Sequence, residues 1–80
     1  MTKEKIVETI NLFLKETLEV EESLIQPMSS LKEDIGLTSL DAVEISIFIK
    51  RTFGFQPERG DMQFIRTLDD LYNYVETHQQ

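Results

Sequence analysis

Apolar residues recur at helical spacing in three segments of this 80-residue chain, and polar residues cover the other sides of those segments. In the first segment, Thr2 stands at the expected N-cap and Glu4 in the first turn suits the helix dipole. One side of this segment is apolar, with Ile6, Ile10, Phe13, Leu14 and Leu18 in line and Val7 beside them. The pattern predicts a long amphipathic helix over residues 3–18.

The periodicity fails from Glu19 to Thr38, where Pro27 and Gly36 interrupt any regular element. Loops of this length are uncommon in compact domains unless they are functional or pinned to the core. Apolar residues are spaced irregularly through this one, at Val20, Leu24, Ile25, Met28, Leu31 and Ile35. We therefore expect a long loop that packs against the core, with a helical turn near Leu31.

A second helix is predicted over residues 39–52, with Gly54 as its stop signal. At about 100° per residue, a core stripe forms from Ala42, Ile45, Ile49 and Phe53. A second stripe has mixed chemistry and contains Leu40, Glu44, Ile47 and Arg51, with Asp41 and Phe48 beside it. Phe48 fits two interpretations, as an exposed anchor for a partner or as a side chain under the long loop.

The last third of the chain predicts a short helix after Pro57 and a longer helix that Thr67 opens. Asp70, three residues after Thr67, completes the pattern of a capping box. One face of the longer helix holds Leu68, Leu71 and Val75, joined by Tyr72 or Tyr74, and residues 77–80 are expected to fray. The fold class is therefore all-α, a small bundle of three main helices plus one short helix in a single domain over 1–80, with a long loop between helices 1 and 2.

The composition narrows the kinds of site and partner. The chain has no cysteine, which excludes disulfides, thiolate metal sites and a cysteine nucleophile, so any thiol chemistry needs an added group. A net charge of −7 argues against nucleic acid and anionic membranes as partners and favours basic protein surfaces. There is no run of apolar residues long enough for a membrane span, and no signal-peptide pattern at the start. We expect a cytoplasmic monomer with no metal site.

The segment from Glu33 to Asp41 is the most informative motif. It places a glycine turn and two hydroxyl residues, Thr38 and Ser39, at the start of the second helix. Backbone N–H groups and the helix dipole favour an attached negative group at such a position. By local chemistry alone a hydroxyl there is a helix cap, and Thr38 and Ser39 compete for that role.

The wider pattern resembles the acyl carrier protein family, in which a serine carries 4'-phosphopantetheine. That family has an amphipathic helix, a long loop, and then a motif of the form Phe/Leu-x-x-Asp/Glu-Leu-Gly-x-Asp-Ser-Leu that opens the next helix. The matching residues are Leu31, Asp34, Ile35, Gly36, Ser39, Leu40, Asp41, Val43, Glu44 and Phe53, and the likeness resumes at Ile65, Thr67, Leu68, Leu71, Tyr74 and Val75. The likeness covers essentially the whole chain in the expected order. It implies that Ser39 is the attachment position for 4'-phosphopantetheine from coenzyme A.

The resemblance also implies a function and a set of partners. The protein would be a substrate shuttle, not an enzyme, that holds acyl intermediates as thioesters for a fatty acid, lipid or polyketide-type pathway. Its partners would be a phosphopantetheinyl transferase and acyl-loading, acyl-transfer or condensing enzymes with basic surfaces. The partner face would lie on the second helix, at Leu40, Asp41, Glu44, Ile47 and Arg51. No catalytic residue is expected, and the single histidine, His78, lies in the predicted loose tail.

Two departures from the family pattern favour a specialised member. Thr38 stands where family members usually have Asp, and Lys50 and Arg51 stand where they are often acidic. A peptidyl or amino-acid carrier is an alternative within the same class. The alternative of another class is an unmodified helical interaction module that keeps the fold and lacks the arm.

Overall fold

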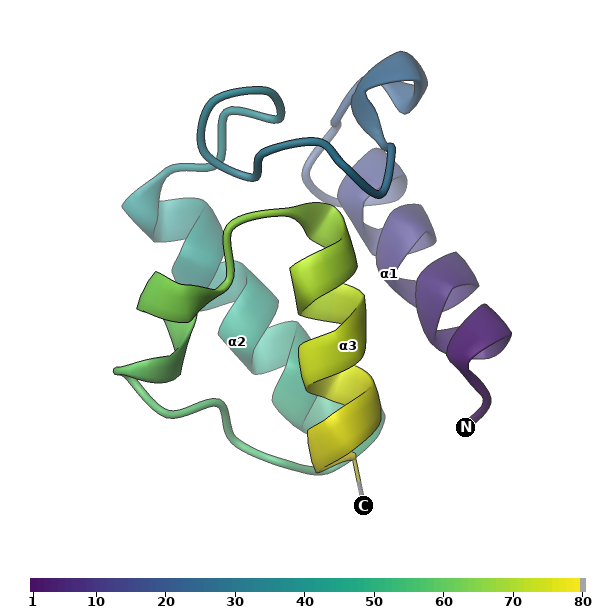
Figure 1. Cartoon of the computed structure of the whole chain (residues 1–80), viewed down its shortest axis with the longest axis vertical. Coiled ribbons are helices and arrows are strands. Elements are labelled where there is room, and N and C mark those ends of the chain that lie inside the picture. Colours follow the sequence, from purple (N-terminus) through teal and green to yellow (C-terminus); the bar gives the residue numbers. More distant parts are fainter. Residues whose placement is uncertain (80) are drawn as a thin grey trace.

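The computed structural model describes residues 1–79, which form a small helical bundle (Figure 1). Its elements are α1 (Lys3–Glu16), the 3₁₀ helix η1 (Glu22–Leu24), α2 (Ser39–Phe53), the 3₁₀ helix η2 (Asp61–Phe64) and α3 (Leu68–His78). Over residues 1–79 there is no strand, and the only β-type pairing is an isolated bridge between Ser30 and Thr67. The predicted all-α bundle of three main helices is confirmed. Within the same range, no helix is long and apolar enough to cross a membrane.

The first helix begins as predicted and ends two residues early. Thr2 caps it by accepting a hydrogen bond from the Lys5 N–H at 3.2 Å. After Glu16 the chain turns back, because Glu19 adopts a left-handed backbone conformation with φ of 56°. The Val20 N–H then donates to the Leu14 carbonyl at 2.9 Å and closes the helix end.

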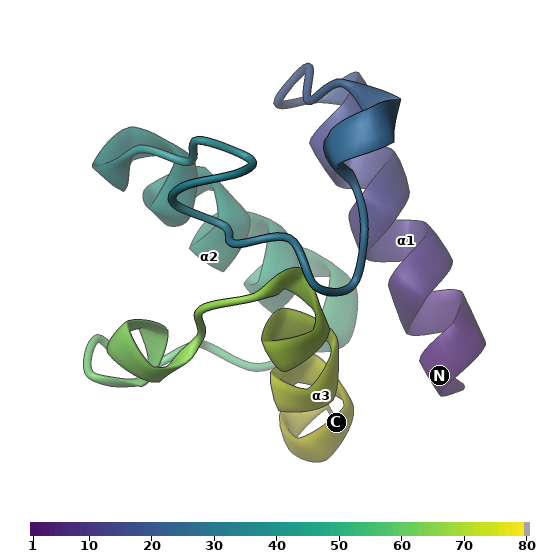
Figure 2. The same cartoon turned by 45° about the horizontal axis from the view of Figure 1, so that its top comes forward.

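The long loop is pinned to the start of α3, as its scattered apolar residues predicted. The Leu31 N–H donates to the Arg66 carbonyl at 2.9 Å, and the Leu68 N–H donates to the Ser29 carbonyl at 3.0 Å. Leu31 is buried, and Figure 2 shows the loop crossing over the first turn of α3. The prediction is wrong for two residues, since Met28 is 79% exposed and Leu24 lies at the surface on η1.

The turn expected near Leu31 is present without becoming a helix. The N–H groups of Asp34 and Ile35 both donate to the Ser30 carbonyl, at 3.0 and 2.9 Å. The Asp34 carboxylate in turn accepts from the Ser30 N–H at 2.7 Å. Because these contacts close the turn on itself, it does not propagate, and the helical residues of the loop lie earlier, at η1.

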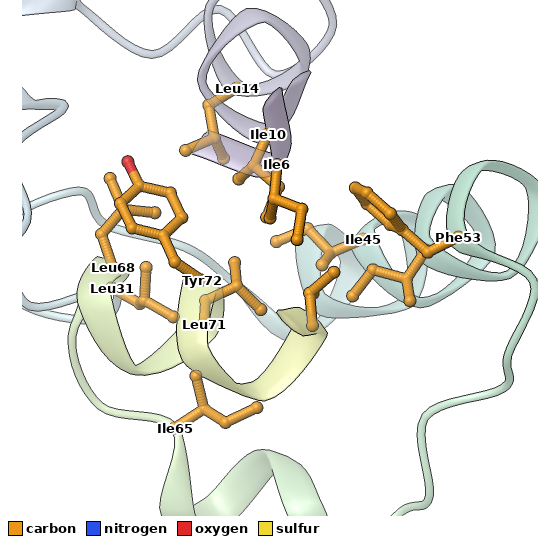
Figure 3. Packing of buried hydrophobic residues seen from close by; sticks show 12 residues of the cluster. Ile6, Ile10, Leu14, Leu31, Ile45, Phe53, Ile65, Leu68, Leu71 and Tyr72 are labelled. Atoms are coloured by element: carbon orange, nitrogen blue, oxygen red, sulfur yellow. The ribbon is translucent and has the colours of Figure 1, made fainter. Parts of the chain in front are cut away.

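The core lies between the three helices and under the long loop (Figure 3). It consists of Ile6, Ile10 and Leu14 from α1, Ile45, Ile49 and Phe53 from α2, and Leu68, Leu71, Tyr72 and Val75 from α3, with Leu31 and Ile65 from the connections. The predicted inner faces are therefore confirmed, except that Phe13, Leu18 and Ala42 are only half-buried and Leu18 lies beyond the end of α1. Of the two tyrosines, Tyr72 is the buried one, while Tyr74 is half-buried and donates from its hydroxyl to the Asp61 carboxylate at 2.8 Å.

Phe48 takes a position that neither sequence interpretation described. Its ring stacks on Phe13 of α1 with centroids 4.0 Å apart, and it meets Phe53 edge-on at 5.9 Å. The side chain is half-buried and packs against the core between α1 and α2. The exposed-anchor interpretation is therefore wrong, and α1, not the long loop, is what covers the ring.

The end of the chain is more regular than the prediction of fraying. α3 continues to His78, and the Gln79 N–H donates to the Val75 carbonyl at 2.9 Å. The Gln79 side chain also donates to the Met1 carbonyl at 2.8 Å. Fraying was wrong for residues 77–79, because these contacts continue the helix and tie it to the other end of the chain. The part of that prediction that concerns Gln80 lies outside the described residues.

The short helix expected after Pro57 is confirmed as η2, a 3₁₀ helix that begins only at Asp61. Pro57 does not open it, because a turn at residues 59–60 intervenes. α2 likewise ends close to its predicted limit, where Gly54 adopts φ of 80° and donates its N–H to the Lys50 carbonyl at 3.2 Å.

Candidate functional site

The first turn of α2 is closed by a reciprocal pair of hydrogen bonds. The Thr38 hydroxyl oxygen accepts from the Asp41 N–H at 3.2 Å, and the Asp41 carboxylate accepts from the Thr38 N–H at 3.0 Å. This capping box decides the competition left open by the sequence, because Thr38 is the N-cap and Ser39 is the first helical residue. Gly36 leads into the box with φ of 79°, a conformation that residues with a side chain resist.

Ser39 is exposed, and its hydroxyl has no structural task. Within residues 1–79 the Ser39 hydroxyl takes part in no hydrogen bond, since Thr38 and Asp41 already satisfy each other. In the same part of the chain, the backbone N–H groups of Ser39 and Leu40 have no acceptor. Both groups lie at the positive end of the helix dipole. A serine oxygen that carried an anionic group here would meet open donors and a favourable dipole.

The sequence periodicity explains why this turn stands clear of the bundle. The buried residues of α2 begin only at Ile45 and continue through Ile49 to Phe53. The first six residues of the helix therefore contribute no fully buried side chain. Figure 2 shows this end of α2 at the periphery, away from α1 and α3. A large enzyme could approach Ser39 without displacing another element.

The predicted partner residues lie on one exposed face of α2, with one exception. Leu40 is 71% exposed and Ile47 is 49% exposed, and Glu44 and Arg51 are exposed beside them. The exception is Asp41, which is half-buried and is held by Thr38. Its first role in the structure is to cap the helix.

Val43 is a surface residue that the predicted partner face omitted. It is 55% exposed and lies three residues after Leu40 and four before Ile47, so the three side chains share one side of the helix. The same 3–4 spacing was available from the sequence. The predicted mixed stripe contained only positions 40, 44, 47 and 51. Val43 was omitted because it lies on the neighbouring row of side chains.

Three ionisable side chains on α3 have shifted pKa values, and hydrogen bonds or burial within the fold explain each shift. Hydrogen bonds from the backbone N–H groups of Thr67 and Arg66 lower the pKa of Asp70. Burial raises the pKa of Tyr72. Burial, followed by the hydrogen bond to Asp61, raises the pKa of Tyr74 to about 12. Among the described residues, no group of three or more His, Cys, Asp or Glu side chains is arranged to hold a metal ion.

Comparison with known proteins agrees with this geometry. Residues 8–75 match the family described as "Phosphopantetheine attachment site". A protein of Coprothermobacter proteolyticus named "Acyl carrier protein" is 35% identical over 78 residues, which cover 98% of this chain and 95% of that protein. The chain belongs to the acyl carrier protein family. Members of this family are carriers and not catalysts, and their prosthetic group is phosphopantetheine.

The residues at the start of α2 fit that prosthetic group. The group needs an accessible hydroxyl for its phosphodiester, and Ser39 supplies one in the first turn of the helix. The open N–H groups of Ser39 and Leu40 suit the negative charge of the linkage. The arm supplies a thiol, which the chain itself lacks. Thr38 caps the helix without placing a negative charge next to the Ser39 hydroxyl.

Proposed function

We propose that this protein carries acyl groups as thioesters on a 4'-phosphopantetheine arm joined to Ser39, and that residues 1–80 are a single carrier domain. It would present these groups in the cytoplasm to enzymes of a fatty acid, lipid or polyketide-type pathway. The observation that carries the proposal is the exposed Ser39 hydroxyl, which is free of hydrogen bonds within residues 1–79 at the start of a helix capped by other residues.

The electrostatics of the helix start support this position. A phosphodiester on the Ser39 oxygen adds one negative charge close to the open N–H groups of the first turn. Such a charge is typically stabilised by about 0.3–1 kcal/mol at an exposed helix N-terminus. Attachment would leave the capping box in place, because neither Thr38 nor Asp41 uses the Ser39 side chain. We therefore expect the modified and unmodified forms to share one fold.

The partner face proposed from the sequence begins next to this hydroxyl. Leu40, Glu44, Ile47 and Arg51 are exposed along α2, and Asp41 closes the first turn. A transferase or an acyl-handling enzyme that reaches the arm would meet these residues first. We propose that Glu44 provides the negative contact for basic residues of such enzymes, while Asp41 mainly holds the turn in shape.

Intact mass tests the attachment directly. Apo protein is incubated with coenzyme A and a broad-range phosphopantetheinyl transferase, and we expect a mass gain of one phosphopantetheine group. Ser39→Ala should abolish the gain. Ser46→Ala is the matched control on the same helix and should leave it unchanged. The absence of any gain with several transferases, or a gain that survives Ser39→Ala, would reject attachment at this position and favour an unmodified interaction module.

The choice of pathway needs a second test. Thr38, Lys50 and Arg51 depart from the usual acidic residues at these positions, and we propose that they mark a carrier for a dedicated pathway. A fatty-acid synthase ketosynthase and malonyl transferase should then use the holo protein less well than their own carrier. Equal kcat/KM with both carriers would argue for general fatty-acid synthesis instead.

A further inference from the structure

The last turn of α2 carries two exposed positive charges, Lys50 and Arg51. The ion pairs within residues 1–79 join Lys5 to Glu8 and Lys15 to Glu22, so neither base is neutralised by an acidic side chain there. Positive charge at a helix C-terminus suits the dipole, which accounts for the position along the helix. It does not account for which side of the helix the charges occupy.

The two bases lie on the side of α2 that faces away from the core. At about 100° per residue, Arg51 is in line with Glu44, one heptad earlier, and Lys50 is in line with Val43. Three exposed apolar side chains lie on this outer face, those of Leu40, Val43 and Ile47, and Glu44 lies between the last two. The face therefore begins at Ser39, continues as an apolar row that includes one acid, and ends in positive charge, over roughly 16 Å from residue 40 to residue 51.

We propose that this outer face of α2 binds an enzyme surface of mixed charge. That surface would have apolar groups opposite Leu40, Val43 and Ile47, a basic group opposite Glu44 and a carboxylate opposite Arg51 and Lys50. The proposal rests on the proposed function, since it takes Ser39 as the base of the arm. A uniformly basic surface would set like charges together at the Arg51 end, and such contacts suppress binding of wrong partners. The face would therefore favour enzymes that have a carboxylate at this position over enzymes whose docking surfaces are uniformly basic.

The size of the face suits a transient enzyme contact more than a stable pairing of two copies. Three exposed apolar side chains fall far short of the roughly 800 Å² per partner that a stable interface buries. The net charge of −7 also opposes the approach of a second copy of this chain. A carrier that visits several enzymes in turn needs contacts that release quickly, and a small face of this kind provides them.

Photo-cross-linking identifies the partner and its chemistry together. A benzophenone amino acid replaces Ile47, which is exposed one turn before Arg51, so both bases stay in place, and apo and holo protein are each irradiated in extract of the native cells. The cross-linked peptide of the partner enzyme is then mapped. We expect Asp or Glu next to the linked residue. A peptide rich in Lys or Arg, or no cross-linked enzyme in either form, overturns the proposal. A missing arm, seen by mass, overturns the proposed function alone, because the cross-link does not need the arm.

Charge reversal then measures the contact with the purified partner enzyme. Arg51→Glu should raise KM roughly fivefold with little change in kcat, since an exposed ion pair becomes a repulsion. Arg59→Glu is the matched control, because Arg59 is exposed after α2 and makes the same change in net charge. Its KM should change less than twofold. Replacing the mapped carboxylate of the enzyme by Lys should restore binding of Arg51→Glu.

Three results would contradict the mixed-charge face. Equal effects of Arg51→Glu and Arg59→Glu would mean that only net charge matters. A lower KM for Arg51→Glu would mean that the partner is basic at this end. Light scattering that shows a wild-type dimer, dissociated by Arg51→Glu, would mean that the face binds a second copy. Arg51→Gln removes the charge without reversing it and should give a smaller rise in KM. This milder variant controls for the possibility that Arg51→Glu disturbs folding.

Discussion

Helices α2 and α3 both begin with a capping box, but the residue that follows the cap is in a different environment in each helix. Each starts with a Thr whose hydroxyl accepts from the N–H of an Asp three residues later, and each Asp accepts from the N–H of that Thr. In α3 the residue after the cap is Leu68, which is fully buried. In α2 it is Ser39, which is exposed. The same type of capping box thus supports a core contact in one helix and a free hydroxyl in the other.

The difference comes from where the apolar stripe begins. The stripe of α3 starts at its first residue, Leu68, so the helix start is part of the core. The stripe of α2 starts at Ile45, almost two turns along, so its first turns extend beyond the core. A capped but unpacked turn is rigid at the backbone and open at the side chains. This is the combination that a tethered group needs at its base.

Truncating an apolar side chain in the first turn of each helix should give the largest difference. Leu68→Ala should lower the free energy of unfolding by about 2–5 kcal/mol, because it leaves a cavity under the loop. Leu40→Ala should change it by no more than about 0.5 kcal/mol, because the side chain is already in water. Urea denaturation of both variants measures this. A comparable loss for Leu40→Ala would show that the start of α2 is packed after all.

A second comparison tests where α2 is held. Phe48→Ala should cost about 2 kcal/mol, less than a fully buried Phe, because the ring is half-buried between Phe13 and Phe53. Ile47→Ala, one position along on the exposed side, should cost well under 1 kcal/mol. Thermal melts of the two variants measure the gap. Melting temperatures that fall equally would mean that the outer face of α2 also packs within the protein.

Removing each cap should give a smaller and still unequal effect. Thr67→Ala should destabilise by about 1–2 kcal/mol and Thr38→Ala by about 0.5–1 kcal/mol. The ordering follows from the surroundings, since Thr67 also pairs with Ser30 of the loop, whereas the first turn of α2 contributes no buried side chain. Both values come from denaturant unfolding. Thr38→Ala should also leave phosphopantetheine attachment possible, because the Ser39 hydroxyl remains.

Periodicity and turn chemistry predicted the three helices, their inner faces and the α3 capping box. They also predicted an exposed stripe on α2 next to Ser39. What they could not predict depended on contacts distant in sequence. Phe48 was ambiguous because its partner, Phe13, lies on another helix. The ordered end of α3 depends on Gln79 reaching Met1, which no local pattern encodes.

The candidate site shows the same limit at shorter range. Thr38 and Ser39 are both able to cap a helix, and only the observed bonds to Asp41 separate their roles. The resemblance to the family implied a partner contact for Asp41, whereas the structure uses its carboxylate for the cap. Side-chain hydrogen bonds between near neighbours are therefore the part of the site that residue types alone left undecided.

The smallest predicted effect comes from a difference in the hydrogen bonds that the two capping carboxylates accept. The Asp70 carboxylate accepts from two backbone N–H groups, those of Thr67 and Arg66, each at 3.1 Å, whereas the Asp41 carboxylate accepts from Thr38. The first pair of bonds favours the charged form and lowers the pKa of Asp70 in the folded protein. Its contribution is therefore complete above the unfolded pKa, about 3.9, and is lost as pH falls through the lower folded pKa.

Asp70→Asn tests this, because Asn keeps an acceptor oxygen and removes the charge. The variant should melt a few degrees below the wild type at neutral pH, and the gap should close in acid, below the folded pKa, as the wild type becomes protonated too. Glu76→Gln, an exposed acid on the same helix outside the cap, is the control for net charge. A gap that stays constant down to strong acid would mean that the N–H bonds do not depend on the charge of Asp70. The two helix starts would then differ only in packing.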